Sequence, residues 1–280
     1  LDCLLIHHLS LSYRKIMFPL RVRSYYSLLQ GTTSPATLCR LAKELGFCGL
    51  TLTDQDNLYG LWDFLKSCKR EGLRPVIGAD VSEPGSEEIV TCLVQNKTGY
   101  ANLCRILTKR KMGRSFTFAA DVPPHSDGLL ILCRDKKLLK QYLLQEIEVA
   151  ADIGAQPTAL GRSLRAFAKE HGLPAVATPD SDLGTGADQQ LYNLLQAIKE
   201  GGSLSRMRQH DRAKNVNWLV SDQEYRKRFA IWPEVVEATE KLAKRCLFSG
   251  PEFGVVMPPW RGEGGQDAQM VLREKAYRGA

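Results

Sequence analysis

The feature that most constrains the fold of this chain is a regular alternation of short apolar strands with amphipathic helices. Expected strands cover residues 19–24, 49–53, 74–81, 89–94, 128–133, 146–153 and 174–178. Expected helices between them cover residues 35–45, 58–71, 99–111, 136–144 and 159–171. Strands this short and apolar, most of them followed by a helix, are typical of a sheet that helices cover on the outside. The alternation therefore predicts an α/β barrel or a barrel-like layer.

Beyond residue 185 the pattern changes to helices alone. We expect helices over residues 188–199, 222–229 and 233–246, and a further helix over residues 268–277. Residues 251–265 are rich in proline and glycine, which favours a linker or an extended arm. Residues 1–16 precede Met17, the first methionine, and we expect them to be a non-native or disordered tail.

Polar residues gather where the predicted strands end. Parallel α/β folds build their ligand sites at the carboxyl ends of their strands, so these residues form the predicted site. They are Arg21, Arg23, Asp54, Gln55, Asp80, Asp180 and Asp182.

The composition of this set decides between three kinds of chemistry. A hydrolase that uses several metal ions needs histidine beside its carboxylates, and these positions contain no histidine. Arg21 and Arg23 alternate onto one face of their strand and would neutralise the aspartates, so a salt-bridged structural core is the favoured interpretation. One alternative is a residual metal site; the other is an anion or nucleic-acid contact made by the two arginines. The metal ligands would be Asp54, Asp80, Asp180 and Asp182.

The charge of the chain permits a nucleic-acid partner without requiring one. Lys and Arg number 38 against 31 Asp and Glu, a formal net charge of +7, and such an excess also serves solubility. Two clusters of basic residues could contact a nucleic-acid backbone. The alternative for each cluster is a helix face that is exposed to solvent and binds nothing. Their residues are Lys109, Arg110, Lys111 and Arg114 in the first, and Arg206 and Arg208 in the second.

Cysteine usage indicates the compartment. None of the eight cysteines forms a Cys-x-x-Cys pair, and several lie inside apolar periodic segments. Free thiols of this kind are typical of a reducing environment, so we expect a cytoplasmic protein. No apolar stretch approaches the roughly 20 residues of a membrane helix.

Several motifs resemble those of the PHP (polymerase and histidinol phosphatase) domain. The resemblance is to the copy that opens bacterial DNA polymerase III alpha subunits and error-prone C-family polymerases. Residues 21–31 stand as Arg-Val-Arg-Ser-Tyr-Tyr-Ser-Leu-Leu-Gln-Gly, and residues 52–60 as Leu-Thr-Asp-Gln-Asp-Asn-Leu-Tyr-Gly. Further matches are Arg-Pro-Val-Ile-Gly-Ala-Asp at 74–80 and Ala-Thr-Pro-Asp-Ser-Asp at 177–182.

The resemblance implies a PHP-type distorted (β/α)7 barrel over residues 17–185. A helical extension packed on the barrel would cover residues 186–250, and residues 251–280 would hold a linker and the start of the following polymerase region. The implied partners are the rest of the polymerase chain, DNA through that chain, and a proofreading exonuclease or the proteins of a mutagenesis complex. The implied role is DNA replication, repair or translesion synthesis.

The departures from the family pattern bear on the chemistry. The family has histidine at the positions of Arg21, Arg23, Gln55 and Asp182, and glutamate at Asp80. The resemblance thus implies that the metal site of this copy is degenerate and holds no metal. The domain would then have a structural or partner-binding role. It also implies no cofactor in this stretch, and Mg²⁺ only for nucleotidyl transfer in the parent polymerase. The alternatives are a stand-alone metal-dependent phosphoesterase or 3′–5′ exonuclease, and a free-standing interaction protein.

Overall fold

The computed structural model describes residues 17–113, 115–204, 218–252 and 267–279. The chain divides into two compact units, residues 1–250 and 251–280. The first unit contains the sheet and the helices around it, and the described part of the second contains α10 (Ala268–Gly279).

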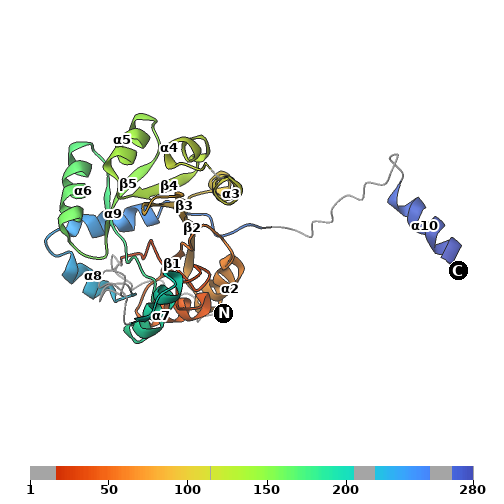
Figure 1. Ribbon diagram of the computed structural model, residues 1–280, viewed down its shortest axis with the longest axis horizontal. Helices are drawn as coiled ribbons and strands as arrows, with labels where there is room; N and C mark the ends of the chain where they lie inside the picture. The colour runs from red at the N-terminus through yellow and green to blue at the C-terminus, as the bar shows by residue number, and fades with distance from the viewer. Residues whose placement is uncertain (1–16, 114, 205–217, 253–266, 280) are drawn as a thin grey trace, which may run out of the picture. The chain divides into compact units, whose positions relative to one another are not determined.

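The first unit is built on one six-stranded sheet in which the strands lie in the order of the sequence (Figure 1). Five of the strands are parallel in direction, and the third runs antiparallel to both of its neighbours. The six residues between the second and third strands are too few for a crossover, so the chain must turn straight back. The strands are β1 (Gly49–Leu52), β2 (Arg74–Ser82), β3 (Ile89–Val94), β4 (Leu129–Cys133), β5 (Val149–Gly154) and β6 (Ala175–Ala177).

A seventh, irregular segment joins the two edges of this sheet. Thr53 N donates to Val22 O at 2.8 Å on the β1 side, and Arg23 N donates to Ser181 O at 2.9 Å on the other side. Residues 19–24, predicted as a strand, contain only a single bridge, Val22 with Ser181. In a regular strand, the side chains of Leu20 and Arg21 would point to opposite faces. Here both point into the barrel, because Leu20 belongs to its inner apolar layer and Arg21 pairs with Asp80. The segment closes the sheet into a distorted barrel, as the sequence predicts.

Helices cover the outside of the barrel, and polar side chains fix where several of them begin. The side chains of Ser34, Asn96, Asp135 and Thr158 each accept a hydrogen bond from a backbone N–H in the first turn, which satisfies a donor that the helix itself cannot pair. The helices on the outside of the barrel are α1 (Pro35–Glu44), α2 (Leu61–Glu71), α3 (Lys97–Met112), α5 (Lys136–Leu144) and α6 (Ala159–Glu170). Of these, α2 begins at Gly60 without a side-chain cap. The short α4 (Phe118–Asp121) was not predicted.

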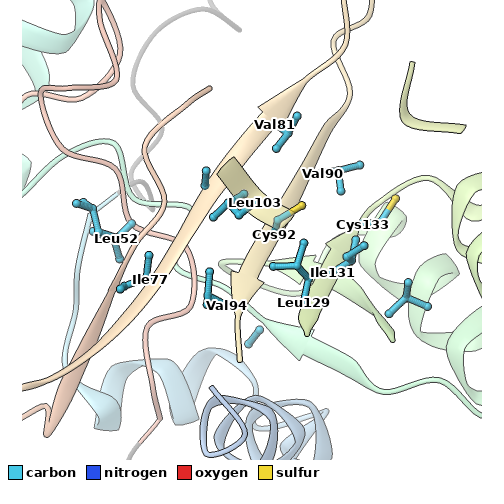
Figure 2. Packing of buried hydrophobic residues seen from close by; sticks show 14 of the residues in the cluster. Leu52, Ile77, Val81, Val90, Cys92, Val94, Leu103, Leu129, Ile131 and Cys133 are labelled. Carbon is cyan, nitrogen blue, oxygen red and sulfur yellow. The ribbon is translucent and has the colours of Figure 1, made fainter. Parts of the chain in front are cut away.

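The apolar core lies on both faces of the sheet. Figure 2 shows part of the outer layer, where Ile77, Cys92 and Ile131 belong to the strands and Leu103 to α3. The inner layer fills the barrel at the end where the parallel strands begin. Its side chains are Phe18, Leu20, Val76, Leu93, Leu130, Leu132, Ala150, Val176, Leu242, Ala243 and Cys246.

The helix α9 (Pro233–Ala243) closes that apolar end of the barrel, after α7 (Gln189–Lys199) and α8 (Asp222–Arg228). Thr239 Oγ1 accepts a hydrogen bond from Ala177 N at 2.8 Å, which fixes α9 against β6. Arg74, at the start of β2, donates to the carbonyl oxygens of Cys246 and Ala243 at 2.9 and 3.1 Å. A cation at these carbonyls also complements the negative end of the helix dipole. With this end filled, the other end carries the polar site.

Within the described ranges, no helix has both the length and the apolar character that crossing a membrane requires.

Candidate functional site

The polar site begins where the side chains that point into the barrel change, along a strand, from apolar to charged. Side chains two residues apart on a strand share a face, so a buried aliphatic residue places the residue two or four positions later inside the barrel. Three strands repeat this change at their carboxyl ends. The pairs are Val76 and Asp80 in β2, Leu132 and Arg134 at the end of β4, and Ala150 and Asp152 in β5.

Asp80 lies at the centre of the site and is fully buried. Its Oδ2 accepts hydrogen bonds from Arg21 Nε at 2.9 Å and from Arg23 Nε at 2.7 Å. Its Oδ1 accepts a third from Thr91 Oγ1 at 2.5 Å, because β2 and β3 are paired with Asp80 opposite Thr91. Burial alone would raise the pKa of Asp80, but Arg21 and Arg23 outweigh it and hold this pKa below its usual value. Asp80 is therefore a carboxylate that two guanidinium groups neutralise.

Asp152 forms a second centre. Its Oδ2 lies 3.2 Å from Arg21 Nη1 and 2.9 Å from Arg134 Nε. Its Oδ1 accepts hydrogen bonds from Thr178 Oγ1 at 2.7 Å and from Gly154 N at 2.8 Å. Arg21 thus links β2 to β5, and every oxygen of the Asp152 carboxylate has a partner.

Asp180 and Asp182 complete the site from the segment after β6. Arg134 Nη1 lies 3.0 Å from Asp180 Oδ2, and Arg23 Nη1 lies 2.6 Å from Asp182 Oδ1. Asp180 has a φ of 49°, in the left-handed region that aspartate tolerates better than most residues. Burial opposes ionisation of Asp180, but Arg21 and Arg134 outweigh it and lower its pKa. Burial raises the pKa of Asp182, and the carboxylate of Asp180 acts in the same direction against Arg23.

Together these side chains form the arginine–aspartate cluster, which we define as Arg21, Arg23, Arg134, Asp80, Asp152, Asp180 and Asp182. Three guanidinium groups face four carboxyl groups, and each of the four has an arginine within 3.4 Å. Burial would lower the pKa of Arg23, but Asp80 and Asp182 outweigh it and raise this pKa well above its usual value. Arg23 therefore stays charged and compensates the buried carboxylates of Asp80 and Asp182.

This donor set does not fit a metal ion. Each of the four carboxylates already has at least one oxygen in contact with an arginine nitrogen, and a guanidinium repels a cation. Among the residues that the structure describes, no group of three or more His, Cys, Asp or Glu side chains is arranged to hold a metal.

Asp54 and Gln55, which were grouped with these residues in the sequence, take other places. Asp54 accepts hydrogen bonds from Ser24 N at 2.7 Å, Ser24 Oγ at 2.8 Å and Ser27 Oγ at 2.7 Å. Burial raises the pKa of Asp54, against the opposing hydrogen bonds from Ser27 and Ser24. Gln55 uses its backbone, donating from N to Ser27 Oγ at 3.0 Å. Asp54 thus fixes the loop of residues 24–31 instead of pairing directly with an arginine.

The predicted nucleic-acid contacts are placed only in part. Lys109 pairs with Asp121 at 3.4 Å. Arg110 donates from Nε to the carbonyl oxygen of Ser82 at 2.7 Å. Lys111 is exposed near the end of α3. Arg114, Arg206 and Arg208 lie outside the described residues.

Sequence reasoning missed Arg134 and Asp152. Both follow an inward-facing aliphatic residue by two positions, as the structure shows for Leu132 and Ala150. The same alternation was applied to Arg21 and Arg23 but not to β4 and β5. Extending it along these strands would have found both residues.

Comparison with known proteins finds a matching family model and several relatives of this chain. The family model described as "PHP domain" matches residues 19–163, a range that includes β1 to β5. The chain is 27% identical over 261 residues to an error-prone DNA polymerase of Anaeromyxobacter dehalogenans (strain 2CP-C), covering 84% of this chain and 23% of that polymerase. It is 27% identical over 263 residues to the DNA polymerase III subunit alpha of Escherichia coli (strain K12), covering 81% and 22%.

A third relative is the DNA polymerase III subunit alpha of Caulobacter vibrioides, 26% identical over 297 residues, with 93% of this chain and 26% of that subunit covered. The chain thus spans about a quarter of the length of these curated relatives. Among solved structures, it matches a putative metal-dependent phosphoesterase from Bifidobacterium adolescentis with a TM-score of 0.43 and 14% identity, covering 76% of this chain and 95% of that one.

Proposed function

The chain belongs to the PHP domain family, and from this premise we propose that it is the N-terminal PHP domain of a bacterial DNA polymerase III alpha-type subunit, with a structural salt-bridge cluster in place of a metal site. The polymerase relatives that cover most of this chain support the polymerase context. The parent chain would copy DNA in the cytoplasm, in replication or translesion synthesis, using Mg²⁺ held elsewhere in that chain.

One observation carries the proposal that the site is structural: three arginines bind the carboxylates directly. Arg23 alone donates to Asp80 at 2.7 Å and to Asp182 at 2.6 Å. A buried ion pair of this kind is balanced only while both partners are present. A metal ion would have to displace the guanidinium groups and leave buried positive charge behind, so the cluster favours the arginines over a metal.

The position of the arginines gives the cluster a structural task. Arg21 and Arg23 belong to the segment that closes the barrel, and their partners lie in β2, in β5 and after β6. The closing segment has few backbone hydrogen bonds because it is not a regular strand. The ion pairs would therefore hold it in place across the barrel, which suits a domain that supports a polymerase and offers a surface to its other domains or to partner proteins.

The test is an assay for hydrolysis. The purified chain would be incubated with a chromogenic phosphate ester and, separately, with end-labelled single-stranded DNA, each with Mn²⁺, with Zn²⁺ and with EDTA. We expect no product above that formed with EDTA. Metal-dependent hydrolysis that disappears in both Asp54→Asn and Asp180→Asn would contradict the proposal and make the chain a PHP phosphoesterase or 3′–5′ exonuclease.

A further inference from the structure

Aromatic side chains are exposed on one side of the polar end of the barrel. Tyr25 is 43% exposed, Tyr59 is 64% exposed and Trp62 is 58% exposed. Large aromatic residues are usually buried, since each removes much apolar surface from water. Three exposed ones on two neighbouring loops and the helix that follows therefore require an explanation other than the core.

Tyr26 connects these rings into one surface. Its ring centroid lies 4.7 Å from that of Tyr25, and its hydroxyl donates to Asp63 Oδ2 at 3.0 Å in the first turn of α2. A Cβ atom at Gly60 would lie 2.7 Å from the Tyr26 ring, so the ring rests against the start of α2. Tyr59 and Trp62 flank this contact in the sequence.

The loops that carry these rings are held rigidly. Asn57 Nδ2 donates to the carbonyl oxygen of Tyr26 at 3.0 Å, and Asn57 Oδ1 accepts from Tyr59 N at 3.0 Å. Asp54 fixes the other end of the first loop through Ser24 and Ser27. The rings are thus presented in fixed positions, and a ligand that stacks on them would not have to order them first.

Positive charge continues the surface along α2. Trp62, Lys66 and Arg70 are spaced at intervals of four residues and share a face, with Lys69 beside them; all four are exposed. Arg70 pairs with Glu71, whose Oε1 lies 2.9 Å from Arg70 Nε, so we assign the main attraction for phosphate to Lys66 and Lys69. The opposite face of α2 carries the buried Leu61, Phe64 and Cys68, and Figure 1 shows this helix on the outside of the barrel beside β2. We call this surface the aromatic–basic strip: Tyr25, Tyr26, Tyr59, Trp62, Lys66, Lys69 and Arg70.

We propose that the aromatic–basic strip binds single-stranded nucleic acid. Exposed aromatic rings stack on unpaired bases, and the adjacent lysines attract the phosphates that join them. The bases of a duplex are already stacked on each other, so a duplex can use only the charges. The assignment rests on the residues of the strip and not on the state of the arginine–aspartate cluster, so the two proposals fail separately.

The experiment measures binding of fluorescein-labelled oligo-dT by fluorescence anisotropy, with the full chain and unlabelled competitors. The charge variant is the double substitution K66E/K69E, and its matched control is K137E/K140E, which reverses two exposed lysines at the same spacing on α5. We expect K66E/K69E to weaken binding at least about tenfold and to reduce the dependence of binding on salt. The control should stay within about twofold of the unmodified chain.

A second pair of variants tests stacking. Y59A/W62A should weaken binding at least about tenfold, whereas W62F, which keeps a ring, should stay within about threefold. L144A removes a side chain that is 77% exposed on α5 and serves as the control. Thermal melting of every variant confirms that it is folded.

Three results would overturn the proposal. The first is equal loss in K66E/K69E and K137E/K140E, which would mean that binding follows total charge. The second is no loss in Y59A/W62A. The third is competition by a duplex as strong as that by unlabelled oligo-dT, which would remove the role of stacking.

Discussion

Nε of Arg23 lies 2.7 Å from Oδ2 of Asp80, and both side chains are almost completely shielded from solvent. Asp80 comes from β2, while Arg23 belongs to the irregular segment between β1 and the residues after β6. The pair therefore connects the closing segment to β2, the strand that lies beyond β1 in the sheet. Its contribution to stability depends on both charges being present, which makes it open to direct test.

Arg23→Met should destabilise the protein by about 3–5 kcal/mol, because it leaves buried carboxylates without their partner. Arg23→His should also be destabilising, since the shorter histidine side chain cannot reach Asp80 and Asp182 together. The measurement is urea unfolding followed by circular dichroism.

Arg40→Met is the matched control for this series. Arg40 lies on α1 with 63% of its side chain exposed, 4.0 Å from Glu44, and an exposed pair contributes about 0–1 kcal/mol. If Arg23→Met and Arg40→Met lower the free energy of unfolding by the same amount, the Arg23 guanidinium is not a buried, paired charge.

The contribution of Arg23 to the free energy of unfolding should decrease as the pH falls. The pKa of Asp80 is lowered in the folded protein because Arg21 and Arg23 outweigh burial. A group with a depressed pKa contributes stability above its ordinary pKa and loses it as the pH falls through the folded value. The difference in unfolding free energy between the unmodified chain and Arg23→Met should thus be largest near pH 7 and narrow below about pH 4. A difference that stays constant from pH 7 to pH 3 would contradict this.

Thr91→Val should destabilise the protein by about 1.5–3 kcal/mol, because the Thr91 hydroxyl donates a hydrogen bond to a charged carboxylate at 2.5 Å. Thr51→Val is the control with the opposite expectation. Thr51 Oγ1 is buried without a hydrogen-bond partner, so replacing the hydroxyl should be neutral or stabilising. Chemical unfolding of both variants decides whether the hydrogen bond to Asp80, and not the shape of the side chain, is what matters.

Gly31→Ala should destabilise the protein, by about 1–3 kcal/mol if the loop can shift. A Cβ atom at position 31 would lie 1.8 Å from the carbonyl oxygen of Ser24, and Ser24 is one of the residues held by Asp54. Gly202→Ala, with no atom within 4 Å of its Cβ, is the control. Similar thermal midpoints for the two variants would show that the loop of residues 24–31 is not closely packed.

Most of the fold could be predicted from the sequence because strand and helix periodicities, glycine stops and helix caps are local signals. Ser34 and Pro35, for example, mark the start of α1 in the sequence and in the structure. The antiparallel direction of β3 was missed. The six residues between β2 and β3 are too few for the crossover that a parallel pair needs, so the length of this connection would have indicated it. The closing segment was predicted as an ordinary strand. Its irregularity arises from tertiary packing, since Leu20 and Arg21 both face inward, and no local pattern records that.

The site could be predicted less completely. Arg21, Arg23, Asp80, Asp180 and Asp182 meet at one end of the barrel because parallel strands bring their carboxyl ends together. Arg134 and Asp152 were missed. Asp54 comes from the same end of the barrel, but its direct partners are Ser24 and Ser27. Which of several polar residues near a strand end turns inward depends on the exact register, and the sequence does not give that register.

The proposal that arginines take the place of metal ions is tested most directly by measuring bound manganese. The chain would be dialysed to equilibrium against Mn²⁺, which prefers the oxygen ligands that the cluster would offer and not the chain's free thiols. The bound metal would then be measured by elemental analysis, with Asp180→Asn in parallel. We expect fewer than about 0.1 manganese ions per chain, whereas an intact two-metal site binds about two. Binding of one or more ions per chain that is lost in Asp180→Asn would contradict the account.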